Sequence, residues 1–406
     1  MTELDDEVLL ARVYLNRVAE PASVPMWHLI AALGPVDAAR ALRSGRANAA
    51  LLAETEARRA VADPEADLLA AERHGVRLVV PESADWPHFG FAALDRAVVP
   101  RVAAYTAGRY TRRESGEPVP PVALWVRGSG DLATVGVRSV GIVGARAATA
   151  YGEHVTADLA YGLAGRDVVV VSGGAYGIDA AAHRAALAAG GQTVLVSAGG
   201  LDRAYPPGHT ALFDRAAESG LILSESPPGC APQRRRFLTR NRLIAALSTG
   251  VVVVEAASRS GAINTAGHAS VLGRPLMAVP GPVTSAMSVG CHDLLRRDVD
   301  PALLVTSVED VLAVVGRAGE GLARRDPGPA DVRSELDELD PTARRVFEGL
   351  PARRFAGPQE IAARSGVSPL DVIRVLPTLD IAGLIEASDV GEYRVSPRVR
   401  SRVRTA

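Results

Sequence analysis

The chain has 406 residues, of which 22% are charged and 48% hydrophobic, and its formal net charge is −1. This length is enough for two or three domains, and the composition is typical of globular rather than disordered chains. No apolar run approaches the length of a membrane span, and the first residues are acidic where a secretory signal would be basic. We therefore expect a cytoplasmic protein with no membrane span.

The cysteine and lysine content excludes several kinds of site. Cys230 and Cys291 do not form a CxxC pair, so we expect no disulfide scaffold and no metal site. The sequence contains no lysine, which makes all 45 basic side chains arginine and excludes Schiff-base and P-loop lysine mechanisms. Arginine binds phosphate well through its planar fork. Because the whole chain is nearly neutral, an anion-binding surface must be a local cluster of arginines.

The first 62 residues are rich in Ala, Leu and Arg, with apolar spacings of three and four. This pattern predicts a small helical domain in which one helix ends and the next begins at residues 33–35. Two short strand-like pieces follow at 77–80 and 122–126. Between them, residues 112–121 predict an exposed loop.

From residue 140 the chain alternates short β-branched runs with Gly-rich turns and Ala-rich helical segments. Continuous apolar strands are buried on both faces, and connections of ten or more residues make their pairing parallel. The pattern predicts an α/β domain over residues 63–316, with a Rossmann-like, doubly wound, mostly parallel sheet. The predicted strands are residues 140–143, 168–172, 193–197, 221–224, 251–255 and 275–280.

The last part of the chain predicts a linker and a third domain. Residues 317–340 have the polar, Gly- and Pro-rich composition of a linker. Residues 341–406 contain three helical segments and a short hairpin, which together predict a winged-helix domain.

Two Gly-rich turns follow predicted strands. In GIVGAR, Gly144 and Arg146 lead into a helix from about residue 149, whose free amides and positive dipole favour an anion. In SGGAYGID, Ser172, Gly173 and Gly174 allow a ligand to approach the main chain. The first turn fits an ordinary strand-to-helix connection equally well.

Asp179 and His183 are four residues apart on one helical face. Such a pair can serve as an acid and a base or as two metal ligands, but we favour a local side-chain pair that stabilises the helix.

The segment PQRRRFLTRNR, residues 232–242, has five arginines and no acidic residue around Phe237. A solvated loop explains such a charge run most simply. However, an apolar helix follows at once, and arginines around an aromatic ring suit single-stranded nucleic acid, whose phosphates they neutralise and whose bases stack on the ring. We favour this second interpretation.

Two further segments carry weaker signals. EAASRSGAINTA ends a strand at Glu255 and begins a helix near Ser260 and Gly261, where helix capping is the simplest interpretation. The sequence Tyr-Pro-Pro at 205–207 predicts a rigid turn. We find no nucleophile elbow and no HExxH pair, so we predict no catalytic residue, no cofactor and a protein that is not an enzyme.

These motifs, in this order, resemble the DprA/Smf family of DNA-processing proteins. Matching stretches include SVGIVGAR at Ser139, VSGGAYGIDAAAH at Val171, LDRAYPPGH at Leu201, RNRLIAALS at Arg240 and VVVVEAASRSGAINTA at Val251. The resemblance spans about residues 66–314. It implies that the N-terminal helices form a sterile-alpha-motif-like (SAM-like) domain and that the winged helix is an additional domain found in many members.

The resemblance implies a protein that binds and protects single-stranded DNA and helps to load the RecA recombinase during natural transformation and recombination. It also implies a homodimer formed through the Rossmann-like domain and no chemical step. Together with the motifs above, it gives a set of predicted nucleic-acid-binding residues: Gly144, Arg146, Ser172, Gly173, Gly174, Arg234, Arg236, Phe237, Arg240, Asn241, Arg242, Ser260 and Gly261.

The sequence departs from the family pattern at four places. Ala145 replaces a serine, Leu238 replaces a proline, and Tyr176 stands where many members have a basic residue, a loss for which arginines at 234–236 can compensate. Residues 109–121 form a longer insertion than is usual.

A second interpretation of the chain is an enzyme, a Rossmann-like nucleotide hydrolase or phosphoribohydrolase of the lysine-decarboxylase-like type. The PGGxGTxxE motif of those enzymes is missing here.

Overall fold

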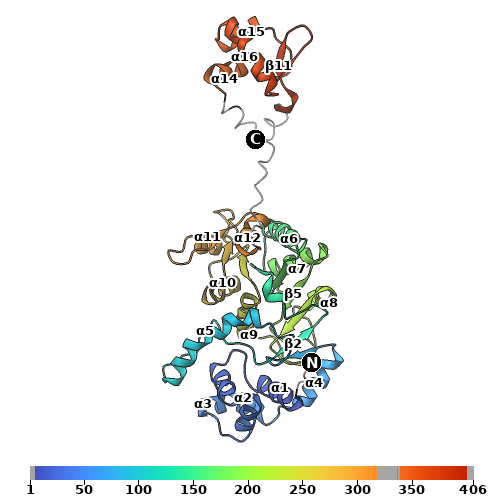
Figure 1. Ribbon diagram of the computed structural model, residues 1–406, viewed down its shortest axis with the longest axis vertical. Helices are drawn as coiled ribbons and strands as arrows, with labels where there is room; N and C mark the ends of the chain where they lie inside the picture. Colours follow the sequence, from blue (N-terminus) through green and yellow to red (C-terminus); the bar gives the residue numbers. More distant parts are fainter. Residues whose placement is uncertain (1–4, 318–335, 337–338, 400–406) are drawn as a thin grey trace. The chain divides into compact units, whose positions relative to one another are not determined.

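The computed structural model describes residues 5–317, 336 and 339–399. The chain divides into two compact units, Met1–Leu322 and Ala323–Ala406 (Figure 1). The domain boundaries at residues 62, 316 and 340 stay predictions. Most of the predicted linker and the C-terminal tail from residue 400 lie outside the described residues.

Four helices open the first unit, each after a residue whose side chain accepts a hydrogen bond from a first-turn amide. The break predicted at 33–35 is confirmed, because Gly34 leaves the helical conformation with φ +75° and Pro35 has no amide hydrogen, so a sharp kink separates two helical stretches of the second helix. Val13 of the first helix belongs to the same buried apolar cluster as Trp125 and Leu195 of the sheet. The four helices are α1 (Asp6–Val18), α2 (Val24–Arg43), α3 (Ala49–Arg59) and α4 (Pro64–Arg73).

The centre of the first unit is a nine-stranded sheet in the order β1-β2-β6-β5-β4-β3-β7-β8-β9. All neighbours from β6 to β9 are parallel, which confirms the predicted mostly parallel α/β sheet, whereas β1 and β2 pair antiparallel at one edge. The strands are β1 (Arg77–Val79), β2 (Leu124–Arg127), β3 (Ser139–Val143), β4 (Val169–Ser172), β5 (Thr193–Val196), β6 (Leu221–Ser224), β7 (Gly250–Val253), β8 (Leu276–Ala278) and β9 (Leu303–Leu304).

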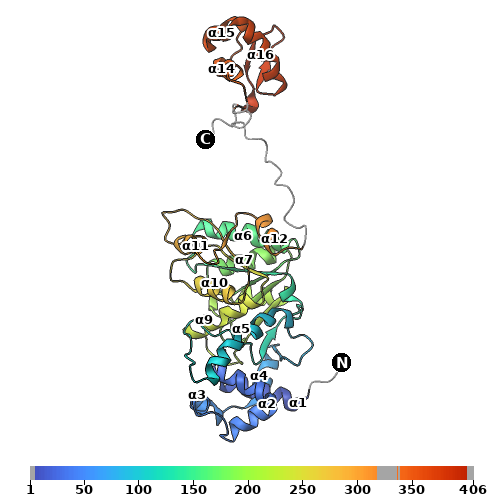
Figure 2. The same ribbon diagram turned by 60° about the vertical axis from the view of Figure 1, so that its left-hand side comes forward.

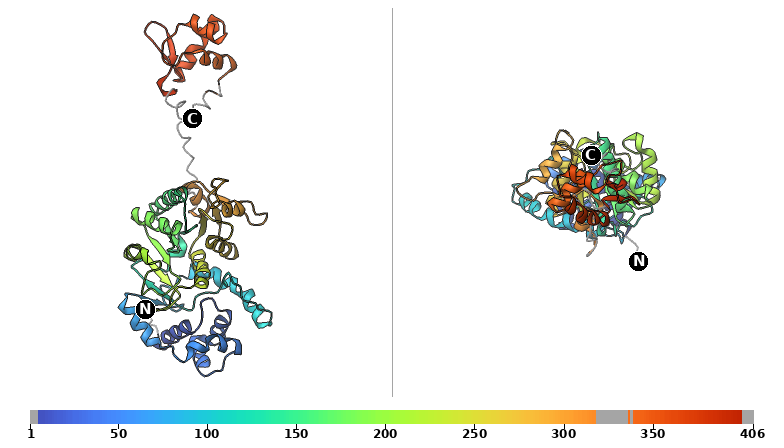
Figure 3. Two further views of the ribbon diagram at one scale, coloured as in Figure 1. Left: turned by 180° about the vertical axis from the view of Figure 1, so that it is seen from behind. Right: turned by 90° about the horizontal axis from the view of Figure 1, so that it is seen from above.

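Helices cover both faces of this sheet, as the unbroken apolar strands require. One face packs against α6 (Ala150–Ala164), α7 (Ile178–Ala188), α8 (Thr210–Ser219) and α12 (Val308–Val315). The other packs against α5 (His88–Thr106), α9 (Arg234–Ala246), α10 (Gly261–Val271) and α11 (Val289–Leu295). Figures 1 and 3 show α6, α7 and α8 together on one side, and Figure 2 shows α9 beside α10. Two short 3-10 turns are η1 (Val135–Val137) and η2 (Pro207–His209).

The strand order reverses direction at β3. The chain proceeds from β3 through β4 and β5 toward one edge, whereas β7 pairs with the other side of β3 and leads through β8 to the opposite edge. Loops that leave two adjacent strands in opposite directions open a crevice at their carboxyl ends, where open α/β sheets bind ligands. The crevice here lies between the loop after β3 and the loop after β7.

The loop predicted to be exposed at 112–121 is exposed only in its first part. Residues 116–121 are buried, and the carbonyl of Val119 accepts a hydrogen bond of 2.8 Å from Nε of Arg242. The Glu117 carboxylate is buried in an ion pair with Arg101. The second half of the insertion therefore belongs to the core of the first unit.

The second unit contains elements in the predicted order, with its own apolar core. They are α14 (Pro341–Gly349), α15 (Pro358–Ser365), α16 (Pro369–Ile381), β10 (Ile385–Ala387) and β11 (Tyr393–Val395), the two strands forming an antiparallel hairpin. Across both units, no helix of the described residues is long and apolar enough to cross a membrane.

Candidate nucleic-acid interface

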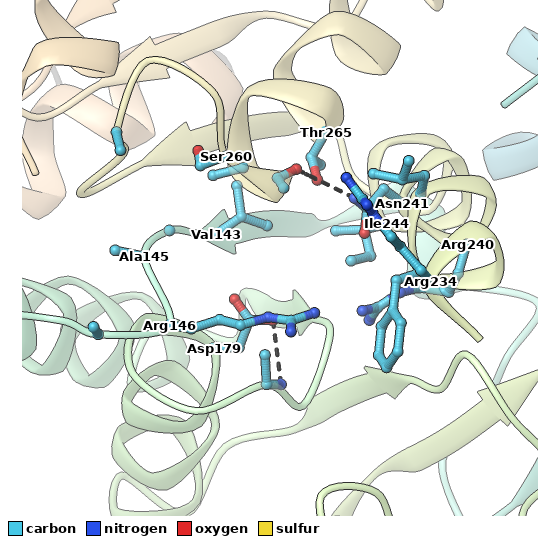
Figure 4. Close-up of a pocket in the computed structure, with 18 of the residues that line it drawn as sticks. Val143, Ala145, Arg146, Asp179, Arg234, Arg240, Asn241, Ile244, Ser260 and Thr265 are labelled. Carbon is cyan, nitrogen blue, oxygen red and sulfur yellow. Dashed lines mark hydrogen bonds between the residues drawn. The ribbon is translucent and has the colours of Figure 1, made fainter. Parts of the chain in front are cut away.

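A pocket of about 730 Å³ occupies the crevice at the carboxyl ends of β3 and β7. Its walls come from the loop after β3, the loop after β7 with the first turn of α10, and one face of α9. Figure 4 shows Arg146 extending from the first of these walls, above Asp179, toward the helix that carries Arg240 and Asn241. Strand topology thus brings together segments more than 100 residues apart.

Three exposed arginines line this pocket, Arg146, Arg234 and Arg259. Within residues 5–317, none of the three forms an ion pair. A guanidinium group that is not neutralised by a carboxylate keeps its full charge for an anion. The pocket is therefore positively charged although the chain is nearly neutral.

An aromatic surface lies beside these arginines. The guanidinium of Arg146 lies 5.0 Å from the centre of the Phe237 ring. The centres of the Tyr205 and Phe237 rings are 5.6 Å apart. Tyr205 is 45% exposed and follows β5 at the same edge of the sheet. From sequence it was predicted only as part of a rigid turn. Tyr205 lies nine residues beyond the end of β5, so no local pattern placed it beside Phe237.

Arg240 forms the floor of the pocket, where it is only 6% exposed. Its guanidinium donates to the carbonyl of Val196 at the end of β5, while its Nε has no hydrogen-bond partner among the described residues. Burial lowers the pKa of Arg240 to about 10, and the nearby Asp179 carboxylate opposes this shift. Arg240 is thus still a cation at neutral pH, held rigidly by the strand.

Asp179 is the acidic group of the pocket, in the first turn of α7. Burial raises its pKa, and the positive charge of Arg240 partly offsets that effect. The carboxylate neutralises part of the charge of Arg240, so the exposed arginines supply most of the attraction for an anion.

The comparisons with known proteins agree with this site. Residues 101–316 match the family described as DNA recombination-mediator protein A. A DprA relative of Mycobacterium tuberculosis is 47% identical over 390 residues, covering 96% of this chain and 95% of the relative. The protein Smf of Escherichia coli is 40% identical over 279 residues, covering 68% of this chain and 72% of Smf. The chain belongs to the DprA/Smf family of DNA recombination mediators.

A solved structure extends the likeness to the fold. The X-ray structure of DprA from Streptococcus pneumoniae matches with a TM-score of 0.57 at 28% identity, covering 76% of this chain and 97% of that one. The α/β unit described above is therefore a DprA-type fold.

Of the predicted nucleic-acid-binding residues, one group lies at the pocket. Its members come from all three walls, as the strand order requires. They are Gly144, Arg146, Arg234, Phe237, Arg240, Asn241, Ser260 and Gly261.

Two of the selected arginines do not reach the pocket. Arg242 is fully buried, and both ends of its guanidinium donate to the Glu225 carboxylate, one of them at 2.6 Å. Arg236 donates to Glu20 of the N-terminal segment at 2.9 and 3.1 Å. The expectation that Arg242 binds phosphate is corrected, because this side chain is enclosed in the core and paired with a carboxylate.

The second Gly-rich turn also has an internal role. The hydroxyl of Ser172 is buried and donates to the carbonyl of Ile142 at 2.6 Å. A Cβ at Gly173 would collide with the Arg240 guanidinium, and one at Gly174 would lie 3.0 Å from Leu195. These small residues make room for Arg240 and Leu195 instead of for a ligand, and none of them lines the pocket.

The start of the helix after the first Gly-rich turn is capped from within the protein. The Glu255 carboxylate accepts bonds from the amide and hydroxyl of Thr149, at 2.9 and 2.6 Å, and the Thr149 hydroxyl accepts from Gly152. A carboxylate at this position accepts the Thr149 amide and offsets the positive end of the α6 dipole. The expected anion site at this terminus is already filled by the protein itself.

At the start of α10 the predicted capping does not occur. Ser260 occupies the N-cap position, but its side chain makes no capping bond and its buried Oγ has no partner. Gly261 is exposed, and a Cβ there would meet nothing within 4 Å. Asn241 donates instead to Asn264 at 2.9 Å, which ties α9 to α10. This end of α10 therefore remains open to the pocket.

Asp179 and His183 do not form the expected local pair. Nδ1 of His183 lies 2.6 Å from the Thr193 hydroxyl, and burial lowers the pKa of His183 to about 3. Asp179 accepts from the amide of Ala175 at 3.4 Å. Among the described residues, no group of three or more His, Cys, Asp or Glu side chains could hold a metal ion.

The three substitutions among the departures from the DprA pattern differ in burial. Ala145 is buried, and its carbonyl accepts the amide of Ile178 at 3.2 Å. Leu238 lines the pocket. Tyr176 is exposed, and its ring packs 4.5 Å from that of His209. Among the arginines expected to replace a lost cation here, Arg234 reaches the pocket and Arg236 does not.

Proposed function

We propose that the pocket between β3 and β7 binds single-stranded DNA. Exposed arginines neutralise phosphates, and the Phe237 and Tyr205 rings offer faces on which unpaired bases stack. Base stacking of this kind contributes about 1 to 3 kcal/mol per base and tolerates any sequence. Paired bases in a duplex have no free face to offer, so the site favours a single strand.

The observation that carries this proposal is the position of Arg146 over the Phe237 ring at 5.0 Å. This arrangement presents a cation and an aromatic face to the same nucleotide. It is rigid on both sides, since Phe237 lies in the first turns of α9 and Arg146 follows directly from a central strand.

Replacing Arg146 by Ala tests the proposal. We expect weaker binding to single strands of every sequence. The slope of log affinity against log salt concentration should become shallower by about 0.7, which is the contribution of one neutralised phosphate. Fluorescence anisotropy with labelled oligonucleotides at several salt concentrations measures both. Arg184→Ala, an exposed arginine of α7, is the matched control. Equal slopes and affinities for Arg146→Ala and wild type would contradict the proposal.

We also propose that the protein carries out no chemical step. Incubation with nucleoside monophosphates should release no free base, as measured by chromatography. Base release that disappears on Asp179→Asn would instead support the nucleotide hydrolase. Asp179 is the acidic side chain that lines the pocket, so it is the residue to change.

The family supports two further proposals about partners. We propose that the protein forms a homodimer through the Rossmann-like unit and helps to load RecA onto the bound strand, in the cytoplasm. Light scattering tests the first proposal, and a pull-down of RecA with and without single-stranded DNA tests the second. A monomer at micromolar concentration, or no RecA retention in either condition, would contradict them.

The second unit fits a winged helix, and the N-terminal helices fit a SAM-like domain. We propose that the winged helix docks a protein rather than duplex DNA. In α16, Arg374 lies 3.6 Å from Asp371, while Leu370, Ile373 and Ile381 are exposed. A chain ending at Leu322 should bind duplex DNA no more weakly than the full chain. A clear loss of duplex binding on truncation would reverse this assignment.

A further inference from the structure

A second groove adjoins the pocket along the start of α9. Its volume is about 560 Å³, and its lining is Arg112, Arg113, Glu114, Arg234, Arg235 and Leu238. Arg234 and Leu238 also line the first pocket, so the two hollows adjoin at these side chains. One wall comes from the insertion that is longer here than the family pattern predicts.

That wall is fixed in place and not a free loop. The carbonyl of Ser115 accepts bonds from Nδ2 of Asn264 at 2.8 Å and from Nε2 of His268 at 3.0 Å. The buried Glu117 carboxylate accepts the amide of Arg113 at 2.8 Å. A Cβ added at Gly116 would lie 3.1 Å from the Thr239 Cα, so the loop packs tightly on α9. The groove exists before any ligand arrives.

The groove carries positive charge that the fold does not use. Arg112 is paired with Glu54 at 3.2 Å, but Arg113, Arg234 and Arg235 are exposed and, within residues 5–317, form no ion pair. Glu114 is the acidic side chain of the lining, which leaves an excess of arginines.

The position of two of these arginines also costs stability in the free protein. Arg234 and Arg235 begin α9, which has no side-chain cap and no acidic residue in its first turn. Cations near a helix N-terminus are disfavoured by the helix dipole. Their neighbour Arg236 is compensated by Glu20, whereas these two have no such partner among the described residues. An anion in the groove would remove this repulsion.

We propose that this groove extends the binding site and holds the sugar-phosphate backbone of the nucleotides that flank those in the pocket. Arg113 and Arg235 each neutralise one phosphate of the same strand, with Arg234 at the junction. The inference rests on the proposed single-strand binding. It assigns a DNA-binding role to the insertion at 109–121, which contains none of the predicted binding residues.

Strand length separates this inference from the proposed function. The affinity of the full-length protein is measured for two oligothymidylates, one of about 4 and one of about 16 nucleotides. These lengths span the usual size of single-strand binding sites. In the double variant Arg113→Ala/Arg235→Ala, affinity for the long strand should fall about 25-fold at 0.1 M salt. The salt slope should fall by about 1.4, because each phosphate contributes about 0.7. Affinity for the short strand should match wild type.

Two further variants complete the test. Arg184→Ala/Arg215→Ala removes two exposed arginines from α7 and α8 and should change neither affinity. Glu114→Gln removes the opposing carboxylate and should strengthen binding of the long strand, a gain that misfolding cannot mimic. If the wild type binds the short strand but neither groove variant alters binding of the long one, the extension is wrong and the pocket stands. If the wild type binds neither strand, both proposals fail.

Discussion

The arginines of the segment RRRFLTRNR have different surroundings in the structure, although the sequence predicts the same binding role for all of them. Arg234 and Arg235 are exposed, Arg236 is paired with Glu20, and Arg240 is held by the carbonyl of Val196. Arg242 is enclosed in the core with Glu225. Helical periodicity turns each arginine toward a different neighbour, and the neighbours decide between a binding role and a structural role.

The buried pair gives a stability prediction. Arg242→Met leaves the Glu225 carboxylate buried without a partner, which typically costs about 3 to 5 kcal/mol of unfolding free energy. Adding Glu225→Leu removes the stranded charge and should recover part of this loss. Urea unfolding measures both variants, and Arg146→Ala serves as a control with wild-type stability. An Arg242→Met protein that is as stable as wild type but binds single-stranded DNA poorly would show that Arg242 is a ligand contact after all.

At this scale, the sequence predicts a residue's role when its local surroundings decide that role. Arg146 comes shortly after β3, which ends at this edge of the sheet, and Phe237 lies in the first turns of a helix that the sequence predicts, so both could be identified as candidates. Glu20 and Glu225 could not be identified as partners of Arg236 and Arg242. The pair Glu20 and Arg236 is 216 residues apart, and no local pattern links the two side chains.

Among the elements, strands and helices of the sheet unit follow closely from sequence. Each β-branched run from 140 to 280 contains a strand, because unbroken apolar runs require burial on both faces. Helix termini were harder to predict. The sequence predicts an anion site at the start of α6, but the Glu255 carboxylate caps this helix. The contact depends on β3 and β7 being neighbours in the sheet.

The junction of α1, α3 and α9 gives a prediction of pH dependence. Glu20 bonds both Arg236 of α9 and Arg58 of α3. Burial alone would raise the pKa of Glu20, but the hydrogen bonds and charges of Arg236 and Arg58 outweigh it and lower the pKa from 4.5 to about 2. A lowered carboxylate pKa stabilises the folded state above pH 4.5, and this stabilisation is lost as the pH falls from about 4.5 through about 2.

Glu20→Gln should therefore lower the unfolding free energy at pH 7 by roughly 3 kcal/mol, and the difference from wild type should shrink as the pH falls toward 2. Urea unfolding at pH 7, 4 and 3 measures this. Glu7→Gln, which breaks the exposed pair with Arg40, is the control and should have little effect. A difference that stays constant across this pH range would mean that Glu20 does not hold the three helices together through its charge.

For the molecule as a whole, the direction of strand order determines where the proposed DNA site lies. The crevice between β3 and β7 collects loops whose arginines are dispersed in the sequence, which is how a chain of net charge −1 presents a basic pocket. Sequence predicted the sheet and the edge at which ligands bind. It did not predict the groove lined by Arg113 and Arg235, because the insertion was expected to be an exposed loop and its packing on α9 depends on contacts from α10.

The central claim, that bases of a single strand stack on the aromatic surface of this pocket, is tested most directly by photocross-linking. A single-stranded oligonucleotide carrying 5-iododeoxyuridine is irradiated with the full-length protein, and the attached peptides are identified by mass spectrometry. Cross-links at Phe237 or Tyr205 are expected, and Arg146→Ala should reduce their yield. Cross-links confined to other surfaces, with none on α9 or on the loops after β3, β5 and β7, would contradict the account.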